Sequence, residues 1–463
     1  MRFLFCILAG FVLVGCVRFS PQLISPEQTA ARFEQGSLAD EALHQYTEAN
    51  LHRTFQTWPP AAWDLETLTL AAFYFNPDLA VNRANYFSVA AGKITAAQRQ
   101  NPIVSVSPVY NTTTAVPSPW LVTASLDVPI ETAGKRGYRQ ARAQHLSDAA
   151  RFGLATAAWD IRTRLRRAML ELWTAQEGET LLRTQQNAQE SIVRLLETEQ
   201  AAGGITPAGV TRERIALEQT RLASLDAESR RSQARVQLAG VIGLPPRALD
   251  GVAIFFEAFT QPPPELPAAD ARRRALFNRT DILGALADYA ASESALQLEI
   301  AKQYPDVHLN PGYEFDQGND KWGVGLSMEL PILNYNRGPI AEADARRQES
   351  AAKFNALQAR VFGEIEIALA SSENARQKFA AAAGLVDQSQ KQERATMEMF
   401  KAGEVSSQSV AAARLESATA ALAQLDARMK AQQAVTALEA ALQSPLELPT
   451  SLLAPPTSQT HRP

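Results

Sequence analysis

The clearest chemical signal in the sequence is Cys16, which closes an apolar run close to the N-terminus. Arg2 is the only positive charge before that run, which extends from Phe3 to Val14 and is too short to span a bilayer. Gly15 precedes the cysteine, in the pattern of a bacterial lipobox. Cleavage there would expose a thiol and an amine for acylation, and more than one acyl chain gives stable anchoring. We predict a lipoprotein signal peptide over residues 1–15 and lipidation of Cys16; an ordinary signal peptide with an incidental cysteine is the alternative.

The other reactive side chains do not form a recognisable catalytic or metal site. The only other cysteine, Cys6, would leave with the signal peptide, and the five histidines include no i,i+4 pair. Met397 and Met399 are soft metal ligands, but two residues apart on a helix they point in different directions, which favours packing. No nucleophile–base pair, phosphate-binding loop or carboxylate pair is evident. The sequence therefore predicts neither an enzyme nor a bound metal or cofactor.

Charge and hydropathy narrow the class of protein further. The formal net charge is −4, which argues against nucleic acid as a partner. Glu364, Glu366 and the arginine-rich run from Arg162 to Arg167 have the pattern of helix-surface charge. After the signal peptide, no stretch of 18 apolar residues is present, so a membrane-crossing segment would have to be a strand.

The chain contains two copies of one pattern, separated by about 200 residues. Gln100-Asn101-Pro102 is matched by Gln303-Tyr304-Pro305, and Val128-Pro129-Ile130 by Leu330-Pro331-Ile332. This period is much longer than the units of solenoids and propellers, which run from about 20 to 50 residues. We therefore predict two tandem structural repeats, each a complete module.

Each repeat contains two segments that alternate between apolar and polar residues, the pattern of a strand with two different faces. We predict strands over residues 103–110 and 120–128 in the first repeat, and over 306–315 and 322–330 in the second. Each has roughly the length that a tilted strand needs to cross a bilayer. The predicted polar, lumen-facing residues are Asp127, His308, Asn310, Glu314 and Glu329. The predicted lipid-facing aromatic girdle consists of Tyr110, Trp120, Tyr313, Phe315 and Trp322. A soluble sandwich with one buried face is the alternative.

The rest of each repeat is predicted to be a hairpin of very long helices. The chain has no proline from Lys135 to Ala201 or from Ile340 to Ala402, and each stretch would form a helix on the order of 100 Å long. Glycine turns follow, with Gly203, Gly204, Gly403 and Glu404 at the tips. Thr206 and Ser406 are the expected N-caps of the returning helices. These helices carry apolar seams at heptad spacing, namely Ile215, Leu222, Leu225 and Val236, and Leu415, Leu422, Leu425 and Met429.

These elements give a complete domain layout. Shorter helices are predicted near residues 65–100, broken at Asn76-Pro77, and near 270–303. The segments are a signal peptide (1–15), an N-terminal anchor and connector (16–60), repeat 1 (61–245, with its helical hairpin at about 135–242), a Pro-rich linker (246–268), repeat 2 (269–445, with its hairpin at about 340–443) and a disordered tail (446–463).

Four membrane strands require partners. Single-chain membrane barrels begin at about eight strands, and an open sheet in lipid would leave unpaired backbone groups that cost several kcal/mol each. The chain is therefore expected to oligomerise, and three copies would give a twelve-stranded barrel continued by a helical tube.

The combination resembles the TolC family of outer-membrane efflux proteins, over about residues 60 to 445. The stretches 130–137 (IETAGKRG) and 300–306 (IAKQYPD) resemble its CzcC-like, heavy-metal branch. The resemblance implies a mainly α-helical homotrimer with a twelve-stranded β-barrel of four strands per chain and a long periplasmic helical barrel. It also implies a passive exit duct, set in outer-membrane lipid, that docks to a periplasmic adaptor and an inner-membrane pump of the resistance–nodulation–division (RND) class.

One departure from that family pattern concerns the tips. Members of the family often carry an aspartate six residues after the hairpin glycine, whereas this chain has Gly209 and Ser409 there. An acidic ring at the tip is therefore not expected. Drug or solvent efflux and type I secretion remain alternatives to metal export, and a lipid-anchored periplasmic coiled-coil scaffold without a pore is an alternative of a different class.

Overall fold

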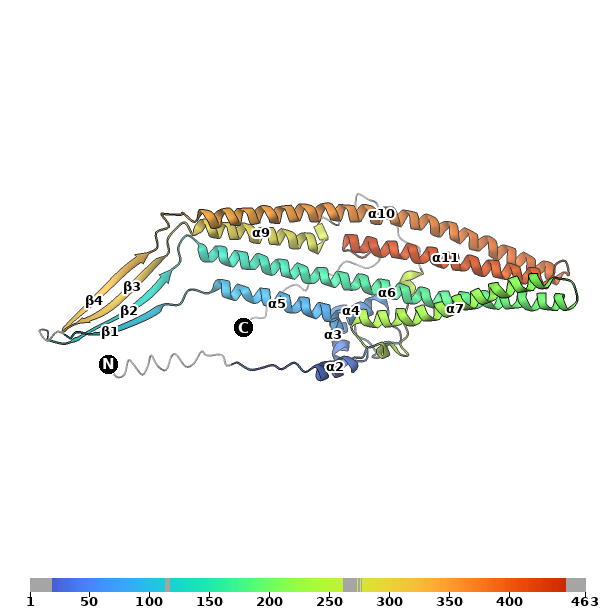
Figure 1. Cartoon of the computed structure of the whole chain (residues 1–463), viewed down its shortest axis with the longest axis horizontal. Helices are drawn as coiled ribbons and strands as arrows, with labels where there is room; N and C mark the ends of the chain where they lie inside the picture. Colours follow the sequence, from blue (N-terminus) through green and yellow to red (C-terminus); the bar gives the residue numbers. More distant parts are fainter. Residues whose placement is uncertain (1–18, 113–116, 261–272, 274, 276, 447–463) are drawn as a thin grey trace.

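The structure is a computed structural model that describes residues 19–112, 117–260, 273, 275 and 277–446. It is strongly elongated, with a β-sheet at one end, two helical tips at the other and a group of small helices beside the middle (Figure 1). The predicted signal peptide, Cys16 and nearly all of the predicted tail lie outside the described residues. Within the described part, no helix is long and apolar enough to cross a membrane.

The sheet has four antiparallel strands in the order β1-β2-β3-β4. Their bounds are β1 Ile103–Tyr110, β2 Trp120–Ile130, β3 Val307–Asp316 and β4 Asn319–Met328. The β3–β4 connection is a two-residue hairpin, in which Gln317 and Gly318 both have positive φ, as a tight primed turn requires. The sequence predicted a strand over 322–330. Those bounds were wrong, because the tight turn allows β4 to begin at Asn319, and it ends at Met328.

The register separates apolar and polar residues onto opposite faces of the sheet. Val106, Ala124, Tyr313 and Trp322 form one row across all four strands, through the pairs Val106↔Ala124, Ala124↔Tyr313 and Tyr313↔Trp322. The row through Ser107, Thr123, Glu314 and Lys321 lies on the opposite face, because successive side chains point to opposite sides of a strand. Trp322 is 82% exposed in the single chain, so the apolar face has no partner there.

Both repeats follow the same order of elements, as the sequence predicted. In each, a helix precedes two strands, and a long helix and a returning helix follow them. The bounds in repeat 1 are α4 Leu65–Phe75, α5 Pro77–Ala97, α6 Lys135–Ala201 and α7 Pro207–Ile242; those in repeat 2 are α9 Thr280–Ala301, α10 Arg337–Lys401 and α11 Ser407–Leu442.

The helices form a single curved layer. Beyond the small helices, toward the tips, the order is α7, α6, α11, α10; on the side of the β-sheet it is α5, α6, α9, α10. Helix α6 therefore lies inside the layer along its length, whereas α5 and α7 form one margin and α10 the other. The sheet likewise ends in β1 on one side and β4 on the other.

The main hydrophobic core lies where α6 and α7 meet the small N-terminal elements. Helix α3 (Glu41–Leu51) packs there with α4 and with two 3-10 turns, Pro246–Leu249 and Glu257–Phe259. Helix α2 (Pro26–Glu34) lies beside these elements and has no buried residue. Trp63 lies in this core and bridges to Ile254 as a short parallel strand pair. Large residues thus gather at mid-length, while alanine dominates the buried positions of α11.

The predicted heptad seam of α7 makes no packing contact within the described part of the chain. Helix α7 packs on α6 through other positions, including Val210, Leu217 and Leu238. The seam residues Leu222 and Leu225 are each 63% exposed. They form an apolar stripe at the margin of the layer. In α11, by contrast, Leu425 and Met429 pack against the main core.

Candidate functional site

The polar face of the sheet carries a network of charged and hydrogen-bonding side chains. His308 Nδ1 lies 2.9 Å from Asp127 Oδ1, joining β3 to β2. Asn310 donates from Nδ2 to Ser327 Oγ at 3.0 Å, joining β3 to β4. Of the residues predicted to face a lumen, Asp127, His308, Asn310 and Glu314 therefore share one face of a regular sheet.

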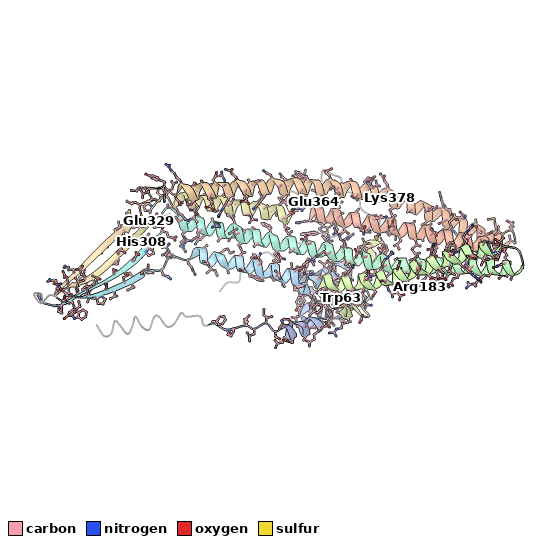
Figure 2. All side chains as sticks on the ribbon, viewed as in Figure 1. Trp63, Arg183, His308, Glu329, Glu364 and Lys378 are labelled. Carbon is pink, nitrogen blue, oxygen red and sulfur yellow. The ribbon has the colours of Figure 1, made fainter. Side chains whose placement is uncertain are left out.

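Glu329 does not belong to that set, because β4 ends at Met328. Figure 2 shows His308 and Glu329 close to the end of the sheet that joins the helices. The prediction missed Lys321, which pairs with Asp316 Oδ2 at 2.5 Å and with Glu314 Oε1 at 3.6 Å. The alternation of β4, continued backward from Gly323, would have placed Lys321 on the polar face.

The aromatic residues are concentrated toward the hairpin end of the apolar face. Tyr110 and Trp120 are paired partners whose ring centroids lie 5.0 Å apart, and those of Tyr313 and Trp322 lie 4.9 Å apart. Phe315 lies on the same face, two residues beyond Tyr313. All five predicted girdle residues thus share the apolar face, and four of them form two cross-strand ring pairs.

The two tips have the same backbone construction. The N–H of Gly204 donates to the Glu199 carbonyl at 2.9 Å, and the N–H of Glu404 donates to the Met399 carbonyl at the same distance. In each case the preceding glycine is left-handed, with φ of +80° at Gly203 and +79° at Gly403, which is the Schellman arrangement of helix ends.

The N-caps of the returning helices differ. The Ser406 side chain accepts from the N–H of Ser409, as predicted. Thr206 also occupies the N-cap position of α7, as predicted, but its side chain makes no such bond. At the same end of the molecule, Met397 lines a groove between the hairpins, whereas Met399 is exposed rather than packed.

The sheet is joined to the helices by an ionic anchor centred on Lys135. Its Nζ donates to the Tyr304 carbonyl at 2.6 Å and to Asp306 Oδ1 at 2.8 Å. Arg136 donates from Nε and Nη2 to the Ala97 carbonyl, at the end of α5. Residues of the stretch 130–137 thus bind at the ends of the two helices that precede the strands.

A second ionic cluster is buried between the repeats, where α6 packs on α11. Arg162 and Arg166 were predicted to be surface charge, which was wrong, because their side chains are only 4% and 1% exposed. Arg162 Nη1 lies 2.8 Å from Glu439 Oε2, and Arg166 Nε lies 3.7 Å from the same oxygen. Arg166 also donates to Thr436 and Gln432, both at 3.1 Å.

The carboxylate in this cluster stays ionised. Burial alone would raise the pKa of Glu439, but the guanidinium groups of Arg162 and Arg166 and the N–H of Leu446 outweigh burial and leave the pKa below its usual value. In the first repeat, an ion pair between Glu179 and Arg231 joins α6 to α7 at 3.0 Å. Within the described part of the chain, no group of three or more His, Cys, Asp or Glu side chains could hold a metal ion.

Comparison with known families identifies this architecture. The model of the family described as "Outer membrane efflux protein" matches residues 76–244 and 271–443, one match for each repeat. The chain belongs to this family. The two matched stretches correspond to the two halves of the helical layer and include all four strands.

Individual relatives agree with this assignment. The chain is 25% identical over 233 residues to the cobalt-zinc-cadmium resistance protein CzcC of Cupriavidus metallidurans, covering 49% of this chain and 55% of that one. It is 24% identical over 262 residues to the pyoverdine export outer membrane protein OpmQ of Pseudomonas aeruginosa, covering 54% of each. The chain thus spans about half the length of these curated relatives.

Solved structures show the same fold. The outer membrane protein VceC of Vibrio cholerae superimposes with a TM-score of 0.66 at 19% identity, over 83% of this chain and 97% of that one. At this identity the likeness concerns the fold. Both the family and its structural neighbours are outer-membrane channels rather than enzymes.

Proposed function

We propose that this efflux-family chain forms a homotrimeric exit duct in the outer membrane. The duct would conduct substrates passively from a periplasmic adaptor and an RND-type inner-membrane pump to the exterior. The observation that carries the proposal is that neither the β-sheet nor the helical layer closes on itself within one chain. Its sheet ends in β1 and β4, and its helical layer ends in α5 and α7 on one side and in α10 on the other.

Joining these margins between copies would close both layers at once. Strand β4 of one copy would pair with β1 of the next, and α10 would pack against α5 and α7. The exposed seam on α7, with Leu222 and Leu225, supplies apolar surface at that margin. A head-to-tail contact of this kind closes into a ring when its rotation is a simple fraction of a turn. Three copies would give twelve strands, with the apolar face toward lipid.

The charges on the polar face favour cations as cargo. That face carries the carboxylates of Asp127, Glu314 and Asp316 against the ammonium of Lys321. These three carboxylates and one ammonium sum to −2 per chain. The similarity to CzcC, whose name specifies cobalt, zinc and cadmium resistance, supports heavy-metal cations in particular. The name of OpmQ specifies pyoverdine export, which keeps an organic cargo as the second candidate.

Docking of the adaptor is proposed at the helical tips. A groove of about 980 Å³ runs between α6 on one side and α10 and α11 on the other, close to both turns. Phe400, Val410 and Ala411 provide an apolar lining, and Arg414 and Glu393 lie in the same groove. We propose that the tips separate when the adaptor and pump assemble.

Conduction is tested by planar-bilayer recording of the purified full chain. A trimer that conducts, with a preference for K⁺ over Cl⁻, is expected. The variant Glu314→Gln/Asp316→Asn should reduce that preference, whereas Glu342→Gln, in α10 outside the sheet, should not. Absence of conductance from correctly folded trimers would support the pore-less scaffold instead.

Cargo and gating are tested in cells. A deletion strain should become sensitive to zinc, cobalt or cadmium; sensitivity to antibiotics alone would favour organic export. Disulfide crosslinking of the Gly203→Cys and Gly403→Cys tips should abolish efflux, and a reductant should restore it. Efflux that continues with the crosslink formed would contradict tip opening.

The proposed lipid anchor at Cys16 is tested separately. Radiolabelled palmitate should be incorporated into the wild-type chain but not into Cys16→Ala. Labelling of both chains would rule out Cys16 as the site.

A further inference from the structure

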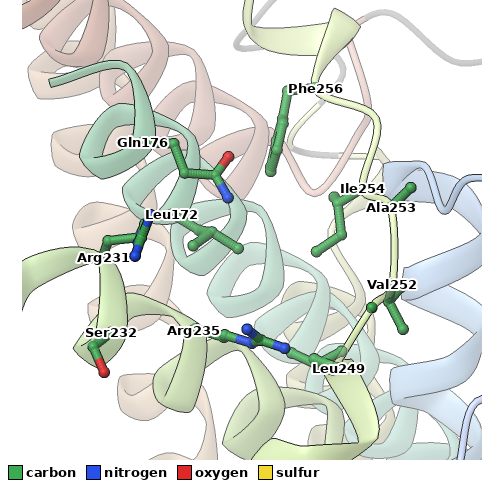
Figure 3. Close-up of a pocket in the computed structure, with 11 residues that line it drawn as sticks. Leu172, Gln176, Arg231, Ser232, Arg235, Leu249, Val252, Ala253, Ile254 and Phe256 are labelled. Atoms are coloured by element: carbon green, nitrogen blue, oxygen red, sulfur yellow. The ribbon is translucent and has the colours of Figure 1, made fainter. Parts of the chain in front are cut away.

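A cavity lies beside the main core, away from the sheet and the tips. It has a volume of about 520 Å³, within the range of roughly 300–1,000 Å³ typical of ligand sites. It lies between α6 and α7 on one side and the segment from Leu249 to Phe256 on the other (Figure 3). Leu172, Ile254 and Phe256 give it an apolar lining, and Arg231 and Arg235 border it from α7.

One wall of the cavity is a segment that pairs with Trp63 in a single β-bridge at Ile254 and has an open edge on its other side. Trp63 donates its N–H to the Ala253 carbonyl at 2.9 Å and accepts from the N–H of Phe255 at 2.8 Å. Successive backbone groups alternate in direction along a strand, so the N–H and C=O of Ile254 point away from Trp63. Neither group hydrogen-bonds to any described residue. Trp63 does not line the cavity, and the open edge is therefore the one on the cavity side.

Two guanidinium groups line the cavity, and neither of their partner carboxylates does. Arg231 pairs with Glu179 at 3.0 Å, and Glu179 is shared with Arg183 outside the cavity. Arg235 pairs with Asp250 at 2.6 Å. Each guanidinium has five N–H donors, so Arg231 and Arg235 retain donors for a further carboxylate.

We propose that this cavity binds an extended peptide segment of another protein, which adds as a strand to the Ile254 edge and presents a carboxylate side chain to Arg231 and Arg235. An open strand edge provides main-chain hydrogen bonds, and the neighbouring pockets accept alternate side chains. A peptide satisfies the backbone of Ile254 and the guanidinium donors together, whereas an acyl chain would fill only the apolar part. The site lies on α7, away from the tips (Figure 1), and the proposal is independent of conduction.

The site is tested with the purified full chain in detergent and a fluorescent peptide, acetyl-Thr-Val-Glu-Val-Thr-amide. Saturable binding by fluorescence anisotropy is expected. Arg231→Gln/Arg235→Gln, or glutamine in place of the peptide's glutamate, should weaken binding by about tenfold or more, the scale of a charge-assisted hydrogen bond. The control Arg230→Gln, on the same helix but outside the cavity lining, should bind within about twofold of wild type.

Strand addition is tested by altering the peptide rather than the protein. Two isomeric peptides carry one N-methyl group each, on opposite backbone edges. The isomer that is methylated on the edge facing Ile254 loses a main-chain hydrogen bond and should bind about tenfold more weakly, whereas the other isomer should bind normally. Three results would overturn the proposal. The two isomers could bind equally well, Arg230→Gln could weaken binding as much as the double variant does, or the peptide could show no saturable binding. Binding of laurate without binding of the peptide would overturn it too, by showing an amphiphile site.

Discussion

The buried cluster between the repeats makes Glu439→Gln the most informative stability variant. At an effective dielectric constant of about 20, a unit charge pair at 2.8 Å attracts by about 6 kcal/mol and one at 3.7 Å by about 4.5 kcal/mol. Desolvation of three buried charges offsets most of this attraction. The measurable quantity is therefore the cost of breaking the cluster, which for a buried pair is about 3–5 kcal/mol.

The substitution leaves Arg162 and Arg166 buried without their counter-charge. We expect the free energy of unfolding to fall by about 3–5 kcal/mol per chain. The loss would be measured as a lower unfolding temperature by circular dichroism at fixed protein concentration. The matched control is Asp426→Asn on the same helix. It removes an exposed i,i+4 pair with Lys430 and should cost about 0.5 kcal/mol or less. A Glu439→Gln loss no larger than that of the control would refute the reasoning.

The same carboxylate predicts a direction for pH dependence. Because the folded-state pKa of Glu439 is lowered from 4.5, its contribution is fully present above that value and is lost as the pH falls through the folded-state pKa. Glu439→Gln should therefore flatten the stability profile in the acid range below about pH 4.5. Replacing all three charges with Met, Met and Leu should restore much of the stability, because a well-packed apolar cluster avoids the desolvation cost.

Two further perturbations test the tips and the ionic anchor. Gly203→Ala/Gly403→Ala should destabilise the tips by roughly 1–2 kcal/mol per site, because both residues have a left-handed backbone that disfavours any Cβ. An added Cβ would meet nothing within 4 Å, so the backbone conformation alone causes the loss. Proteolysis at the tips should accelerate, whereas Gly204→Ala should not have this effect. Lys135→Met should lower the free energy of unfolding by about 2 kcal/mol, because its charged hydrogen bonds are lost, and should increase hydrogen exchange at the sheet–helix junction. The control Lys430→Met replaces an exposed lysine and should change stability very little.

The strands could be predicted because alternation survives even when a sheet has no partner in its own chain. Both faces of the sheet are exposed in the single chain, yet the register still separates Tyr313 and Trp322 from Glu314 and Lys321. The largest error in the strand bounds was at β4, where the start was three residues late. A two-residue turn at Gln317-Gly318 could have been recognised from the glycine, and it would have placed Asn319 and Lys321 in the strand.

The buried charges could not be predicted in the same way. Arg162 and Arg166 lie on a helix that has neighbours on both sides, and their counter-charge, Glu439, is about 270 residues away in the other repeat. Local sequence contains no sign of that pairing. The packing partner of the α7 seam could not be predicted for a related reason. Heptad spacing shows that an apolar stripe exists but does not say which helix, or which copy of the chain, covers it.

Two of the contacts between the repeats, one at mid-length and one at the tips, differ in strength, and this difference bears on gating. At mid-length, α6 and α11 are held together by the cluster around Glu439 and by the neighbouring large core. At the tips the hairpins meet through a small apolar cluster of Ile192, Leu196, Val210 and Ala411. Separating the tips exposes a few side chains, whereas separating the helices at Glu439 would break a buried charge cluster. The proposed opening should therefore stop short of Glu439, with the helices bending between the tip cluster and the charged cluster.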